Sequence, residues 1–93
     1  MNDIYFLKSP ADINKDIASR MRARRKEKKL SQTELSTRSD VSLGSLKRFE
    51  STGEISLSSL IKIAFALGCE EDFEHLFAKK KYLSIREVID EQA

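Results

Sequence analysis

Residues that build cross-links, metal centres and catalytic sites are scarce in this chain. Its 93 residues include one cysteine (Cys69), one histidine (His75) and no tryptophan. A single cysteine excludes an internal disulfide framework and a cysteine-rich metal site. Cys69 and His75 are close enough in sequence to form a catalytic pair on paper, but we favour a small core residue at a helix end for Cys69 and a helix surface for His75. With no phosphate-binding loop, metal-ligand spacing or paired catalytic carboxylates, we predict no enzymatic activity, no metal and no cofactor.

Long apolar runs and strand patterns are missing as well. No run approaches the roughly 20 residues of a membrane span, and the N-terminus lacks a signal-peptide pattern. We therefore expect a cytoplasmic protein that makes no contact with a membrane. Proline occurs once, and alternation of apolar and polar residues is almost absent. A chain of this length is one domain, and the pattern predicts an all-α fold.

Charge is unevenly distributed along the chain. The formal net charge is only +2, but residues 20–29 contain seven Lys or Arg and one Glu, whereas residues 70–93 contain four basic and seven acidic residues. A basic segment in a nearly neutral protein fits a polyanionic partner on one face. The alternative is a solvated helix without a partner. Within the segment, only the residues that face a duplex, such as Arg20 and Lys29, should contact it.

Capping signals divide the first half of the chain into three helices. Ser9 is the expected N-cap of a helix over about 10–28, with Pro10 at its first position. Ser31 and Glu34 form a capping-box pattern at the start of a second helix that ends near residue 39. Ser42 caps a third helix, which runs to about residue 51. The predicted inward residues are Ile13, Ile17, Ala18, Met21, Ala23, Leu35, Val41, Leu46 and Phe49.

The second half continues the helical pattern. A fourth helix begins at Ser56 or Ser58 and ends at Gly68, with an apolar face made of Leu57, Leu60, Ile61, Ala64 and Leu67. A fifth helix should bury Phe73, Leu76 and Phe77. A last capping-box pattern begins at Ser84 and predicts a short amphipathic helix. We divide the chain into an N-terminal arm (1–9), a helix-turn-helix domain (10–78) and a C-terminal tail (79–93).

The pattern resembles the Cro and phage-repressor type of helix-turn-helix domain, also called the XRE family, over roughly residues 12–78. This resemblance implies a five-helix DNA-binding domain, here followed by a short C-terminal amphipathic helix. It also implies an ion pair between Arg25 and Glu50 that is structural. The features that carry it are Met21 with Arg25, Leu30-Ser31-Gln32, Glu34-Leu35, Val41-Ser42, Leu46, Phe49-Glu50, the stretch 57–64 and Leu67-Gly68.

The family's DNA contacts transfer to individual positions of this chain. Gln32 would grip a phosphate and brace the recognition helix; the alternative is that it only caps its own helix. Arg48 would bind guanine, or else be a surface cation, and Leu43 would touch a thymine methyl group. Because the base-reading positions hold few long polar side chains, we expect DNA shape to contribute. The complete predicted set is Ser31, Gln32, Ser42, Leu43, Gly44, Ser45, Lys47 and Arg48.

Three positions depart from the family pattern. Asp40 stands in the turn where glycine is usual, Lys29 replaces a glycine after the first helix, and Ser39 replaces an aliphatic residue near the end of the second helix. Aspartate tolerates a left-handed backbone better than most residues other than glycine.

Two functions fit these features. The first is a transcriptional regulator, most simply a repressor, that binds an inverted repeat in double-stranded DNA as a homodimer. The second is an antitoxin that binds a toxin protein through its tail and represses its own operon. RNA binding or scaffolding fits less well because few aromatic residues are available to stack on bases. The apolar residues expected at the dimer interface are Phe77, Ile85, Val88 and Ile89.

Overall fold

The computed structural model describes residues 7–80, and every regular element in that range is a helix. This confirms the all-α prediction. The C-terminal helix predicted from Ser84 and most of the N-terminal arm lie outside the described residues. The helices are α1 (Pro10–Glu27), α2 (Gln32–Ser39), α3 (Leu43–Thr52), α4 (Leu57–Leu67) and α5 (Glu71–Glu74). None of these helices is long and apolar enough to cross a bilayer.

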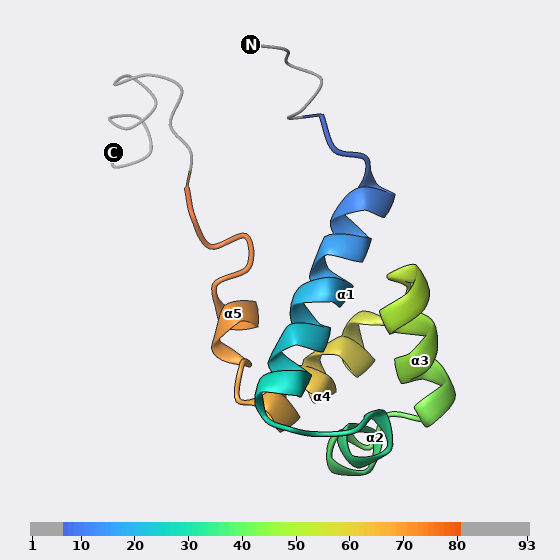
Figure 1. The fold of residues 1–93 in the computed structure, drawn as a ribbon. Coiled ribbons are helices and arrows are strands. Elements are labelled where there is room, and N and C mark those ends of the chain that lie inside the picture. Colours follow the sequence, from blue (N-terminus) through green and yellow to red (C-terminus); the bar gives the residue numbers. More distant parts are fainter. Residues whose placement is uncertain (1–6, 81–93) are drawn as a thin grey trace, which may run out of the picture.

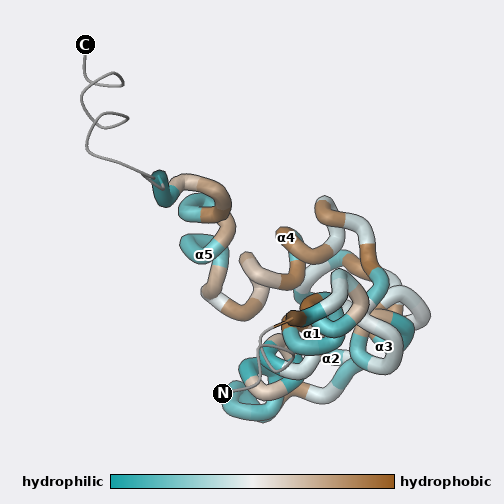
Figure 2. Tube along the Cα trace, turned by 90° about the horizontal axis from the view of Figure 1, so that it is seen from above, coloured by the Kyte–Doolittle hydropathy of each residue, from teal (hydrophilic) through white to brown (hydrophobic). Residues whose placement is uncertain are grey.

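The four longer helices pack around one core, and α5 lies to one side. Helix α1 packs against α3, while α2 packs against both α3 and α4. In Figures 1 and 2, α3 and α5 lie on opposite sides of α1. The core joins residues of α1–α4 and the loops between them; its buried members are Ala18, Met21, Leu30, Leu35, Val41, Leu46, Phe49, Ile63 and Leu67.

A serine side chain caps the N-terminus of each of the four longer helices. Ser9, Ser31, Ser42 and Ser56 each accept a hydrogen bond from the backbone N–H three residues later. At α1 and α2 the capping box is complete. The Glu34 carboxylate accepts the Ser31 backbone N–H at 3.0 Å, and this bond lowers the pKa of Glu34. Local sequence is therefore sufficient to set where these helices start.

The ends of α1 and α4 have the same geometry but different residues. At each end, the backbone N–H groups of two successive residues donate hydrogen bonds to carbonyls of the last helical turns. The first of these two residues has a positive φ. In α4 that residue is Gly68, with φ 72°. In α1 it is Lys29, with φ 57°. Left-handed backbone is costly for a residue with a Cβ atom, which explains physically why glycine suits the position of Lys29.

Two predicted faces are wrong in part. In α1, Ile13 is 47% exposed and Ala23 is exposed, because the buried stripe passes through Ala18, Met21 and Arg25. Ile13 precedes that stripe, and Ala23 lies on the opposite side of the helix. In α4 the side chain of Leu57 is 60% exposed, whereas Ile63, which the sequence prediction omitted, is completely buried.

The predicted fifth helix is much shorter than expected and buries less. Helix α5 ends at Glu74, only Phe73 is half-buried, and Leu76 and Phe77 lie beyond the helix with 54% and 96% of their surface exposed. The prediction that these two residues are buried is therefore wrong within one chain. Cys69 is half-buried against the core and His75 is exposed, as the sequence predicts.

Replacing Lys29 with glycine should stabilise the domain. The substitution removes a left-handed penalty of about 1–2 kcal/mol, offset by about 0.4–1 kcal/mol for the added freedom of the unfolded chain. We expect a net gain of up to about 1 kcal/mol, measured by urea denaturation. The matched control is Lys28→Gly, which removes the same charge at a residue with φ −83° and should destabilise. A Lys29→Gly variant less stable than the native chain would contradict this explanation.

Candidate nucleic-acid interface

A tight turn sets the angle between α2 and α3. Asp40 ends α2 with φ 58°, and Val41, 4% exposed, anchors the turn in the core. The Ser36 hydroxyl donates a hydrogen bond to the Val41 carbonyl at 2.5 Å. Ser39 is buried, but its hydroxyl donates to the Ser36 carbonyl at 3.4 Å, so the polar group has a partner within the helix. The departures at Asp40 and Ser39 therefore leave the helix-turn-helix geometry intact.

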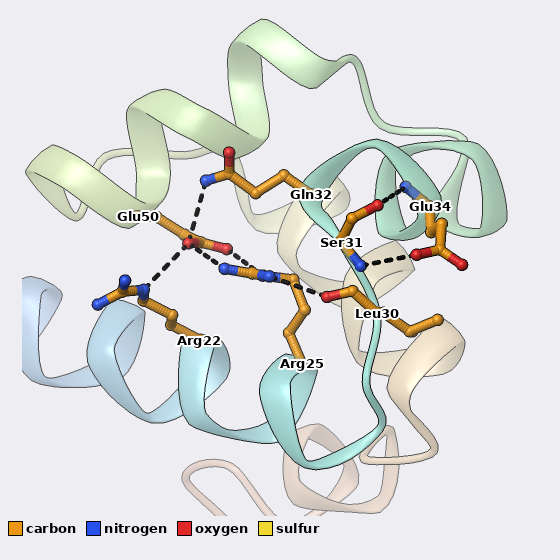
Figure 3. Close-up of polar contacts among 7 residues, drawn as sticks. All are labelled: Arg22, Arg25, Leu30, Ser31, Gln32, Glu34 and Glu50. Carbon is orange, nitrogen blue, oxygen red and sulfur yellow. Dashed lines mark hydrogen bonds and ion pairs between the residues drawn. The ribbon is translucent and has the colours of Figure 1, made fainter.

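One carboxylate connects the recognition helix α3 to the rest of the domain (Figure 3). Glu50 accepts two hydrogen bonds from Arg25, Nε to Oε2 at 2.8 Å and Nη2 to Oε1 at 2.9 Å. Gln32 Nε2 donates to the same Oε1 at 3.1 Å. Arg22 approaches this carboxylate at 3.7 Å. The remaining Arg25 nitrogen, Nη1, donates to the Leu30 carbonyl at 2.9 Å.

The ion pair at the centre of this arrangement, which we call the Glu50 network, is almost completely shielded from water. The side chains of Arg25 and Glu50 are 9% and 6% exposed. A bidentate guanidinium–carboxylate pair has a defined orientation as well as a favourable energy. The network therefore fixes α3 relative to α1, to the α1–α2 loop and to the start of α2. It confirms the ion pair between Arg25 and Glu50 that the family resemblance implies.

The predicted DNA-contacting residues lie at the start of α2 and on α3, and most of them are exposed. Ser31 and Gln32 are at the start of α2, where free backbone N–H groups favour an anion. Ser31 is exposed and Gln32 is half-buried because its amide braces Glu50 on α3. Bracing by Gln32 is thus visible in the structure. The other predicted contacts lie at the start and along the outer side of α3, where Ser42, Gly44, Ser45, Lys47 and Arg48 are exposed and Leu43 is half-buried.

Arg48 has a partner that the sequence prediction missed. Its Nη2 atom lies 2.8 Å from Oε2 of Glu54, and the two side chains are 68% and 62% exposed. Glu54 follows the left-handed Gly53 that ends α3, and its backbone N–H donates to the Thr52 hydroxyl at 3.1 Å. A Cβ on Gly53 would lie 2.8 Å from the backbone of Asn14 on α1, so the turn that places Glu54 needs glycine. The glycine turn at Gly53 was therefore the sequence signal that could have pointed to the contact between Glu54 and Arg48.

The basic residues of α1 have two different roles. Arg25 is buried in the Glu50 network, and Arg22 lies at its edge. Arg20 and Arg24 border a groove between α1, α4 and α5, on the side of α1 away from α3 (Figure 1). Only part of the basic segment is therefore available to a polyanion that contacts α3.

Residues 21–73, more than half of the chain, match the family model described as Helix-turn-helix. Together with the α2–turn–α3 geometry and the Glu50 network, this match establishes the class. The chain belongs to the helix-turn-helix family of the Cro and phage-repressor type, the XRE family, and is a DNA-binding transcriptional regulator. No curated protein and no solved structure matches the chain significantly.

Neutralising Glu50 should destabilise the fold strongly. Glu50→Gln leaves the Arg25 guanidinium buried without its counter-charge, a change that typically costs about 3–5 kcal/mol. Urea denaturation measures the loss. The matched control is Glu54→Gln, which breaks an exposed ion pair worth at most about 1 kcal/mol. Similar losses in the two variants would show that the Glu50 network does not hold the domain together.

Proposed function

We propose that this protein is a repressor that binds an inverted-repeat operator as a homodimer. The observation that carries the proposal is the exposed outer side of α3, held in a fixed orientation by the Glu50 network. Lys47 and Arg48 supply charge on that side, and Gly44 leaves space, since no atom lies within 4 Å of a Cβ built there. An exposed helix of this kind enters the major groove while the start of the preceding helix contacts phosphates.

The predicted contacts divide into two groups. Ser42, Leu43, Gly44 and Arg48 would face base edges, with Arg48 donating to guanine O6 and N7 and Leu43 against a thymine methyl group. Ser31, Gln32, Ser45 and Lys47 would contact the sugar–phosphate backbone. Ser45 fits this role because its hydroxyl lies 2.8 Å from that of Ser42 at the N-terminus of α3.

Two exposed apolar residues that follow α5 support a homodimer. A single recognition helix reads only a few base pairs, so specificity favours two copies on a two-fold symmetric site. Leu76 and Phe77 expose 54% and 96% of their surface beside one another. Large apolar side chains grouped at a surface are typical of a protein interface.

An antitoxin is the second candidate function. It would use the same DNA-binding surface and offer Leu76, Phe77 and the tail to a toxin protein. The exposure of these two side chains is the observation that favours it. Co-purification with the product of a neighbouring reading frame would support the antitoxin, and a stable homodimer without such a partner would support the repressor.

Selection of bound duplexes from a random pool, at a fixed salt concentration, tests the proposal. We expect an inverted repeat whose half-sites lie about 34 Å apart, one turn of DNA. Arg48→Ala should then weaken binding to the selected duplex by about 1–3 kcal/mol and barely change binding to random duplex. Lys62→Ala, which removes an exposed cation on α4, is the matched control. Equal losses on both duplexes would assign Arg48 to the phosphate backbone.

Glu54 should lower the affinity for DNA through its ion pair with Arg48. Arg48 has to leave Glu54 before it can reach a base, and the carboxylate also repels phosphate. Because exposed pairs are worth up to about 1 kcal/mol, Glu54→Gln should tighten binding up to about fivefold, as measured by fluorescence anisotropy. Glu27→Gln, which removes an exposed ion pair with Arg24 on α1, should change binding less. Weaker binding by Glu54→Gln would instead mean that Glu54 orients Arg48 for its contact.

A further inference from the structure

An apolar groove of about 500 Å³ lies between α1, α4 and α5. Its walls include Met21 from α1, Leu57 and Leu60 from α4, and Phe73 and Leu76 from the α5 region. Figure 2 shows hydrophobic residues along α4 and on the chain that leads into α5. This groove is separate from the predicted DNA contacts because none of its lining residues belongs to α2 or α3.

The rim of the groove is charged in a particular pattern. Arg20 and Arg24 stand along the α1 side, and Asp72 stands on the α5 side. Arg24 is paired with Glu27, whereas Arg20 makes no ion pair with any of residues 7–80. A ligand that fits this groove therefore has an apolar stripe with an acidic group on the side that faces Arg20.

Residues 84–93 of this chain have that composition. Ile85, Val88 and Ile89 are spaced to form one stripe if the segment is helical. The same ten residues contain Glu87, Asp90 and Glu91 against a single basic residue. A ten-residue helix is about 15 Å long, and it would bring apolar side chains to Leu57 and Leu60 and acidic side chains to Arg20.

We propose that the groove of each protomer receives residues 84–93 of a second copy of the chain, so that two copies exchange tails. This inference rests on the homodimer proposed above and names the surface that forms it. Such an exchange gives two identical contacts related by a two-fold axis. It complements the repressor function because it leaves α3 of both protomers free to meet DNA.

The exposure of Phe77 favours a second copy over the same chain as the occupant. Phe77, with 96% of its surface exposed, is not part of the groove lining. A tail folded back on its own groove would leave Phe77 in water, whereas a second protomer covers the groove and the α5 region together.

Cys69 makes a direct test possible. It is the single cysteine of the sequence, it lines the groove, and it is half-buried. Val88→Cys places a thiol on the apolar stripe of the tail. After mild oxidation of the full chain, we expect a covalent dimer on a non-reducing gel, and it should disappear when Cys69→Ser is added. The matched control is Glu87→Cys, which places the thiol outside the apolar stripe of a helical tail. The native chain is a second control, for a disulfide between the Cys69 residues of two copies. Val88→Cys should give several-fold more covalent dimer than either.

Light scattering on the unoxidised protein separates the remaining outcomes. A disulfide formed within one molecule would place the tail in its own groove and overturn the second-copy assignment. If the protein has the mass of two chains but Val88→Cys gives no more covalent dimer than Glu87→Cys, the tail exchange is overturned. The proposed dimeric repressor would still stand. A mass of one chain without linkage would overturn both. As a second variant, Ile89→Asp should convert the dimer to a monomer, while Ser84→Asp should not.

Discussion

The ion pair between Arg25 and Glu50 is the interaction on which the geometry of this domain depends. Both side chains are nearly excluded from water, and removing two charges from water is expensive unless their hydrogen bonds are satisfied. Here the carboxylate accepts from Arg25 and Gln32, and Arg25 also donates to the Leu30 carbonyl. These bonds are satisfied together only when α1, the α1–α2 loop, α2 and α3 occupy one arrangement. The network therefore selects an orientation for α3 that apolar packing alone would leave less defined.

A fixed recognition helix has consequences for how its outer side chains act. Helix α3 is anchored through Leu46 and Phe49 in the core and through Glu50 in the network, so its outward residues reach a fixed distance into a groove. Arg48 is different, because Glu54, the partner of its guanidinium, is itself exposed. An exposed pair of this kind exchanges readily with water. In the proposed DNA complex, the domain would combine a rigid frame with one long side chain that changes partner on binding, and most of the base discrimination would rest on Arg48 and on the shape of the DNA.

Local signals in the sequence predicted most of the fold. Capping serines and the left-handed Asp40 depend on residues a few positions apart, and the structure confirms them. Errors arise where contacts between residues distant in sequence decide which side of a helix is buried. An apolar stripe is at least about 100° wide, so periodicity alone does not decide that Ile63 is buried and Leu57 exposed. Glu54 was missed because its approach to Arg48 depends on the left-handed Gly53. The set of predicted DNA-contacting residues came from family resemblance, and the structure adds that most of them are exposed.

The proposed dimer would account for the exposure of Leu76 and Phe77. Their burial was predicted from their apolar character and helical spacing, and in the proposed dimer a second protomer covers them. Because α3 and α5 lie on opposite sides of α1, the proposed DNA contact on α3 and the proposed protein contact near α5 would use different surfaces. Assembly through α5 would then set the separation and the relative orientation of two recognition helices. In such a dimer, the spacing of the half-sites that the protein prefers is decided by residues that never touch DNA.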